Sequence, residues 1–266
     1  MDALYSADVL VQRLRFAGIL VLALLSLGFV TTPLRESAWH QVKQGQPEMN
    51  LEAIEGSLGH GLVIGVLGGF RTVMADFLWI QANHIWEQHD RVGLDAMIRL
   101  VTTLDPRPEF FWLNSARMVA YDVPSWRIRE EGGFNVVSEA RQMAIDLEQA
   151  EQAFAILRQA LGYHPENPMI YLDFAQIYLN RLKDVERAAE WYLKASKFPD
   201  APYYAARIHA QLLKRLGRYE EAYDFLVALH PTLPDDEPYA HKGVIFERIR
   251  ELEVTLKIPL WERFEP

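Results

Sequence analysis

A recurring spacing of apolar side chains constrains the fold of this chain more than any other feature. The residues recur in steps of four and then three positions, which places three side chains on one face of an α-helix. One group of triplets has alanine in the middle, namely Leu78, Ala82 and Ile85; Trp112, Ala116 and Val119; Tyr171, Ala175 and Tyr178; and Ala206, Ala210 and Leu213. A second group usually begins with alanine, namely Leu94, Ile98 and Val101; Ala153, Leu157 and Ala160; Ala188, Tyr192 and Ala195; and Ala222, Leu226 and Leu229. The two groups predict pairs of antiparallel helices that pack closely through small residues.

The two groups of triplets alternate along the chain with a nearly constant period. Equivalent positions are 34 or 35 residues apart, except for one interval of 59. Prolines fall between the periodic runs, where the first turn of a helix tolerates them. From about residue 72 onward no segment shows a convincing strand pattern of alternating polar and apolar residues. We therefore predict an all-α fold, in which an N-terminal transmembrane helix precedes an α-solenoid of about four helix pairs and a capping helix.

Residues 75–256 resemble the tetratricopeptide repeat, a helix–turn–helix unit of about 34 residues. The best match is the set Gly217, Tyr219, Ala222, Leu226 and Pro234, which fits the family's Gly-x-Tyr turn into its second helix. The resemblance implies a solenoid that binds other proteins on a concave surface, formed by the first helix of each pair.

The resemblance also implies which side chains line that surface, because the family's groove residues are offset from the packing triplets. In this sequence they are Leu113, Arg117, Tyr121, Leu172, Gln176, Asn180, Arg207, Gln211, Lys214 and Arg215. Such a groove is polar and basic, and an acidic or C-terminal peptide segment is its natural ligand. The alternative is that these positions form an ordinary solvated helix face.

One repeat carries about 25 extra residues, at about 122–146, which account for the interval of 59. The part between helix ends near Tyr121 and Glu139 suits an ordered loop, with Trp126, Arg127, Arg129 and Phe134 as its contact residues, and the second helix that follows is predicted to be longer than its equivalents. Loops with such side chains often bind partners, although this one can equally pack on its own solenoid.

The C-terminal end of the repeat region is predicted to consist of a capping helix and a tail. The last helix, at roughly 238–256, is charged on its outer face and would cap the stack. The charged residues are Glu247, Arg248, Arg250, Glu251 and Glu253. The tail, 257–266, is either a docked extension or a linear binding motif.

The N-terminal part predicts a membrane anchor. Residues 16–34 contain no charge, and as a helix they would span about 28 Å, close to the thickness of the hydrocarbon core. A cleaved signal peptide is the competing interpretation, but no A-x-A-like site follows the apolar run. Positive residues slightly favour a cytoplasmic segment 1–15, which would place the solenoid in the periplasm of a bacterium.

The linker, 35–74, contains a second apolar stretch at 58–70, with the sequence LGHGLVIGVLGGF. Gly61 and Gly65 have the spacing that lets membrane helices approach each other closely. The stretch is too short to span a bilayer. It either packs as a lead-in to the first helix of the solenoid, or it contacts the membrane or a membrane partner.

Composition argues against several classes of function. The net charge of −9 is opposite to that expected of a nucleic-acid binder. The chain has no cysteine, and His84, Glu87 and His89 lack the H-E-x-x-H spacing of a zinc site. We therefore predict no catalytic residues, no metal, no cofactor and no enzymatic activity. Three hypotheses remain for its function: a membrane-anchored scaffold for an envelope assembly, an accessory subunit of one membrane complex, and a chaperone-like factor that holds clients.

Overall fold

The structure is a computed structural model of the chain, and residues 69–266 are described below. The predicted transmembrane helix at 16–34, the segment 1–15 and most of the linker 35–74 lie outside the described residues. Within residues 69–266, no helix combines the length and the apolar character needed to cross a bilayer.

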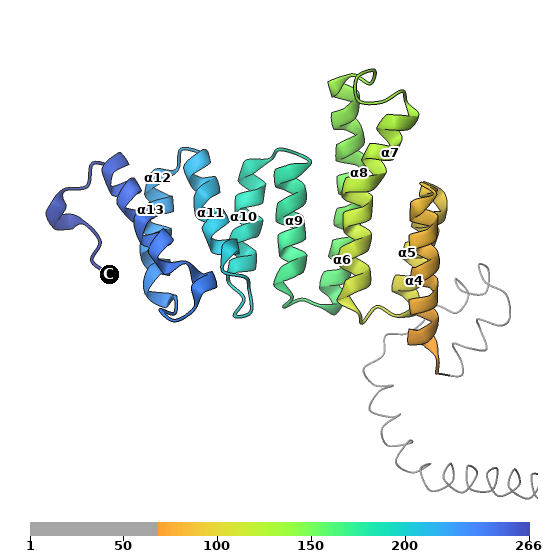
Figure 1. The fold of residues 1–266 in the computed structure, drawn as a ribbon, viewed down its shortest axis with the longest axis horizontal. Coiled ribbons are helices and arrows are strands. Elements are labelled where there is room, and N and C mark those ends of the chain that lie inside the picture. The colour runs from red at the N-terminus through yellow and green to blue at the C-terminus, as the bar shows by residue number, and fades with distance from the viewer. Residues whose placement is uncertain (1–68) are drawn as a thin grey trace, which may run out of the picture. The chain divides into compact units, whose positions relative to one another are not determined.

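The described residues form a series of α-helices, each packed on its neighbours along the chain (Figure 1). The helices are α4 (Arg71–Glu87), α5 (Arg91–Leu104), α6 (Glu109–Arg117), α7 (Val123–Glu130), α8 (Glu139–Tyr163), α9 (Pro168–Asn180), α10 (Val185–Ser196), α11 (Tyr204–Arg215), α12 (Tyr219–Leu229) and α13 (Lys242–Thr255). Short 3₁₀ turns lie at His230–Thr232, Pro238–Ala240 and Leu260–Glu262. Residues 69–266 contain no strand, so this part of the chain has the predicted all-α architecture of paired helices with α13 at the end.

Local sequence explains where several helices begin. A side-chain oxygen of the residue before the helix accepts a backbone N–H from its first turn, which satisfies a donor that has no partner within the helix. The residues that do so are Asp90, Ser138, Asn167 and Asp184, before α5, α8, α9 and α10. At the turn into α12, Gly217 has a φ of 76°, which favours glycine. Gly217 thus has the role expected from the Gly-x-Tyr pattern.

The predicted packing triplets form the core. Their central alanines are 0 to 1% exposed: Ala82, Ala116, Ala175 and Ala210. The buried side chains form successive clusters, one around α6, α8 and α9, one around α9 to α11, and one around α11 to α13. Each cluster joins neighbouring helices, which is the packing expected of a solenoid.

The second helix pair differs from the prediction. Of the loop expected between Tyr121 and Glu139, only residues 131–138 are non-helical, because the helix that begins as α6 continues through a π turn at Met118–Asp122 into α7. The second helix, α8, begins at Glu139 and has 25 residues, which agrees with the longer second helix that the sequence predicts. Pro124 cannot donate a hydrogen bond to the carbonyl four residues earlier, and the wider π turn accommodates it within the helix. The extra residues lengthen both helices of the pair, so α7 and the adjoining part of α8 project beyond the neighbouring helices (Figure 1).

Candidate functional site

Arg117, a predicted groove residue, binds a carboxylate of its own chain. Its Nε and Nη2 atoms donate to the Asp173 carboxylate on α9 at 3.0 Å each. Asp173 is 2% exposed; burial raises the pKa of its carboxyl, and the hydrogen bonds and charge of Arg117 oppose this shift. Arg117 therefore compensates a buried acid and joins α6 to α9, rather than presenting a free charge to a partner.

Tyr121 lies beside this ion pair. Burial raises the pKa of the Tyr121 hydroxyl, and the nearby Asn180 amide partly offsets the shift. The guanidinium of Arg181 lies 5.8 Å from the centre of the Tyr121 ring, and the same arginine pairs with Asp146 of α8. This end of the predicted groove is thus a set of contacts within the chain.

Two predicted groove residues belong to the core. Leu113 is 7% exposed and Leu172 is 0% exposed, so neither offers a side chain to a partner. Both pack against the neighbouring helix pair. Their sequence positions relative to the packing triplets do not predict this contact. Gln176, one turn after Leu172, is half-buried, and Asn180 is exposed.

The remaining groove residues lie on α11, which faces α13. Lys214 Nζ donates to Glu251 of α13 at 2.9 Å, and Arg207 Nη1 donates to the carbonyl of Tyr239, just before α13, at 2.9 Å. Gln211 and Arg215 are exposed. The surface between α11 and α13 therefore contains most of the predicted groove residues that remain accessible.

Arg207 and Arg248, which we call the basic pair, distinguish this surface. Neither guanidinium has a carboxylate within 4.0 Å among the described residues, although most arginines in that part of the chain do. Burial, and after it the positive charge of Arg248, lower the pKa of the Arg207 guanidinium. Two cations that interact electrostatically and have no carboxylate partner among the described residues can bind an anionic group.

Arg248 was not predicted as a groove residue, because its charged neighbours suggested an outer face of the last helix. That prediction also fails for Glu253, which is 0% exposed and accepts the backbone N–H of Phe264 at 2.8 Å. The spacing of apolar residues along α13 is the sequence feature that distinguishes the environment of Glu253 from that of Arg248. Glu253 lies four residues after the buried Ile249 and so shares its face of the helix, whereas Arg248 lies four residues after the exposed Val244.

The residues predicted as loop contacts have different environments. Trp126 is 5% exposed and packs against Trp86 and His89 of the first helix pair, with ring centres 6.3 and 4.8 Å apart. Arg127 pairs with Glu148 of α8 at 2.8 Å. These two side chains hold the extended helix pair together and onto the solenoid. Arg129 and Phe134 are exposed.

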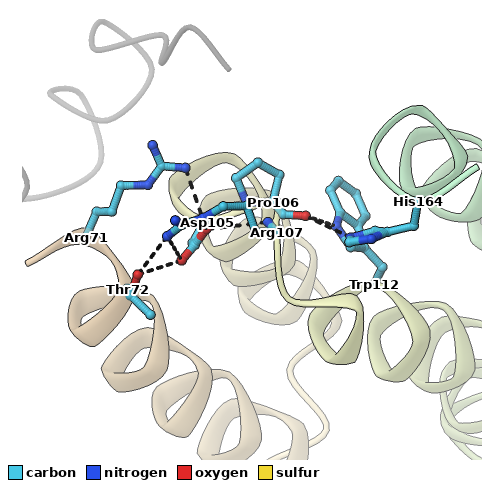
Figure 2. A network of polar contacts seen from close by, with 7 residues as sticks. All are labelled: Arg71, Thr72, Asp105, Pro106, Arg107, Trp112 and His164. Atoms are coloured by element: carbon cyan, nitrogen blue, oxygen red, sulfur yellow. Dashed lines mark hydrogen bonds and ion pairs between the residues drawn. The ribbon is translucent and has the colours of Figure 1, made fainter. Parts of the chain in front are cut away.

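A separate polar network surrounds Asp105 in the turn between α5 and α6 (Figure 2). The carboxylate is 0% exposed and accepts hydrogen bonds from Thr72 at 2.8 Å and from two atoms of Arg107, each at 2.8 Å. Arg71 contributes a further charge at 3.6 Å. Burial alone would raise the pKa of Asp105, but the hydrogen bonds from Arg107 and Thr72 outweigh it and lower the pKa.

The next residue extends this network to another repeat. The carbonyl of Pro106 accepts the indole N–H of Trp112 at 2.8 Å and contacts Nε2 of His164 at 3.3 Å (Figure 2). The network thus ties the start of α4, the turn before α6 and the end of α8 together. Most of its polar groups satisfy one another, which is the arrangement of a structural clamp. The exception is Nε of Arg71, which is buried without a hydrogen-bond partner among the described residues.

The described residues contain no group of three side chains that could hold a metal ion. His84 and Glu87 form an exposed pair at 3.7 Å. The surface between α11 and α13 is therefore the best candidate site in residues 69–266, and its arginines suit an anionic group.

Comparison with known proteins agrees with the helix pairs described above. Residues 144–207 match the family model of the tetratricopeptide repeat, a segment that runs from within α8 to the first turn of α11. The chain matches no curated protein and no solved structure. Tetratricopeptide repeats form solenoids that present extended binding surfaces. Residues 144–207 therefore match the tetratricopeptide repeat, a module that typically binds other proteins rather than catalysing a reaction.

Proposed function

We propose that the chain is a membrane-anchored scaffold that recruits or stabilises components of an envelope assembly, such as a secretion, pilus, transport or respiratory complex. The repeats support the binding of proteins. The uncharged run at 16–34 supports an anchor that crosses the membrane once, with the solenoid on the extracytoplasmic side.

The observation that carries the proposal is the basic pair on the surface between α11 and α13. Arg207 and Arg248 come from two helices that are held in position by other contacts, such as the 2.9 Å bond from Lys214 to Glu251. A carboxylate between two guanidiniums forms charge-assisted hydrogen bonds, which are stronger than neutral ones. The ligand of this surface is therefore an acidic segment or a C-terminal carboxylate of a partner protein.

The neighbouring side chains extend the site beyond a single carboxylate. Gln211 is exposed one helical turn after Arg207, and Arg215 is exposed one turn further along α11. An extended peptide that runs along α11 would meet an amide and then another cation. This arrangement favours a segment with more than one acidic residue.

Crosslinking and purification of the full-length protein from mild detergent would test the proposal. The variant Arg207→Glu with Arg248→Glu places two negative charges where the partner's acid binds. Because each charge-assisted bond is worth about 1.5–3 kcal/mol, we expect capture of the partner to fall roughly tenfold or more. Arg99→Glu is the matched control, since Arg99 lies on α5 with a side chain that is 77% exposed.

The outcome decides between the three hypotheses for the function. A single stoichiometric set of membrane proteins, lost from the double variant, identifies an accessory subunit of one complex, and a varied set of envelope proteins identifies a recruiting scaffold. A diffuse collection of unfolded clients identifies a chaperone-like factor. Partner capture that is equal for the double variant and Arg99→Glu would exclude the basic pair as the binding site.

A further inference from the structure

Helix α4 carries large apolar side chains on two opposite faces. On one face Ala75, Leu78 and Ala82 are buried. On the other lie four residues spaced by three or four positions, which we call the α4 stripe: Phe70, Val73, Phe77 and Ile80, each between 53% and 63% exposed. A helix that is apolar on both sides normally has packing partners on both sides.

Comparison of the α4 stripe with the equivalent positions of the later repeats shows that it corresponds to a packing face. When the first helices are aligned on their packing triplets, the residue equivalent to Phe77 is Phe111, Ile170 or Ala205. These are 3%, 0% and 0% exposed, whereas Phe77 is 62% exposed. The position that is open on α4 is thus closed on every later first helix of the described repeats.

The later helices also show what closes this face. Phe111 packs against Trp79 of the first helix pair, with ring centres 5.3 Å apart. Four residues after Ile170 and Ala205, Phe174 stacks on Phe154 of α8 at 5.2 Å, and His209 contacts the carbonyl of Ala189 in α10 at 2.8 Å. In each case the preceding helix pair covers the face. The α4 stripe is therefore a stacking face of a solenoid and not the polar end that a terminal repeat requires.

We propose that residues 58–68 of the same chain cover the α4 stripe. Their sequence, LGHGLVIGVLG, has no acidic residue, no lysine and no arginine, and it leads directly into α4. As a helix these residues would extend about 15 Å, the same as the distance of about 15 Å from Phe70 to Ile80 along α4. The length and the apolar character of the segment both fit the stripe.

The junction with α4 permits the chain to reverse its direction. Gly69 has a φ of 86°, the left-handed conformation that also occurs at Gly217, where α11 turns into α12. A segment before Gly69 can therefore run back along α4, as the two helices of every other pair do. Gly61 and Gly65 would lie one turn apart and leave room for the bulky ring of Phe77.

The covalent connection favours this occupant over a second copy of the chain. A short linker gives the attached segment an effective concentration in the millimolar range, which a separate molecule does not reach under ordinary conditions. Residues 58–68 would also supply α4 with the packing that a preceding helix pair supplies to each later first helix, and no partner protein would be needed. This inference is independent of the basic pair and of the protein that binds there.

A photo-crosslinking amino acid, p-benzoylphenylalanine, in place of Phe77 in the full-length protein tests the inference in native membranes. We expect an intrachain link to a peptide from 58–68. The same replacement of Phe134, which is 51% exposed at the end of the extended helix pair, is the matched control and should not link to that segment. Links from position 77 to a second copy, to another protein or to lipid would overturn the inference.

The absence of cysteine provides a second measurement that does not depend on photochemistry. Phe77→Cys is combined in turn with a cysteine at Leu62, Val63, Ile64 or Val66, so that at least one pair meets the distance that a disulfide needs. We expect at least one pair to oxidise within the monomer, faster than the same partners combined with Phe134→Cys. If no pair exceeds that control, the segment does not cover the stripe.

Discussion

Single residues decide which charges of this solenoid are available to a partner. Asp173 is nearly inaccessible, and its charge is balanced by one guanidinium, that of Arg117. Arg207 is also a predicted groove residue, but it donates to a backbone carbonyl and has no carboxylate partner in the described residues. The two arginines look equivalent in sequence and differ because only one of them meets a buried acid.

Replacement of Arg117 should therefore affect folding more than binding. Arg117→Gln leaves the Asp173 carboxylate buried without its counter-ion, and we expect a loss of about 2 kcal/mol in the free energy of unfolding, less than for a fully buried pair because Arg117 is partly solvated. Urea unfolding in mild detergent measures the change. The double variant Arg117→Gln, Asp173→Asn has no buried charge without a counter-ion, so it should recover much of the lost stability. If the double variant is as unstable as the single one, the ion pair is not the cause.

At the scale of helices and turns, two glycines with different backbone conformations give opposite expectations. Gly217 has a φ of 76° in the turn between α11 and α12, and a Cβ there would meet no atom within 4 Å. Gly217→Ala should therefore cost about 1 kcal/mol through backbone strain alone. Gly162 lies within α8, and a Cβ there also has open space, so Gly162→Ala should stabilise the protein by about 0.5 kcal/mol.

Thermal unfolding of the two glycine variants beside the parent chain measures the difference. Both substitutions add the same methyl group in open space, so any difference in sign comes from backbone conformation. Destabilisation by both would mean that α8 does not tolerate a side chain at 162, and stabilisation by both would mean that the turn at 217 does not need its left-handed conformation.

At the scale of the described repeats, stability should be local. The C-terminal tail returns to the last helices, where Phe264 donates its N–H to the buried Glu253 at 2.8 Å and its ring lies 5.3 Å from that of His230. Residues of a solenoid contact only neighbouring repeats, so a change at one end should affect that end. The tail is thus part of the last packing unit, while Leu260 and Trp261 remain 75% and 84% exposed.

Removal of the residues after Pro259 tests this locality. Glu253 then loses one of its hydrogen-bond donors, and the aromatic contact with His230 disappears. We expect backbone amides of α12 and α13 to exchange with solvent faster, by roughly tenfold for each 1.4 kcal/mol of lost local stability, while α4 and α5 keep their protection. Equal loss of protection in all helices, measured by hydrogen exchange and mass spectrometry, would contradict a repeat-by-repeat fold.

Much of the repeat architecture was predictable from sequence, because its signals are local. The alanine-centred triplets identify the buried face of each first helix, and residues such as Asp90 and Asn167 mark where helices begin. A helix needs only residues three or four apart to reveal its apolar face. For this reason the all-α solenoid followed from the sequence alone.

The available surface depended instead on contacts between residues far apart in the chain. Leu172 is closed by the neighbouring pair, Arg117 is neutralised by Asp173, and Trp126 packs on the first helix pair, where sequence had suggested a loop. Helical periodicity specifies which side of a helix is apolar, but not which neighbour lies on its remaining sides. The sequence by itself therefore determined the helices and their order, and only the tertiary structure decided which polar side chains are left for a partner.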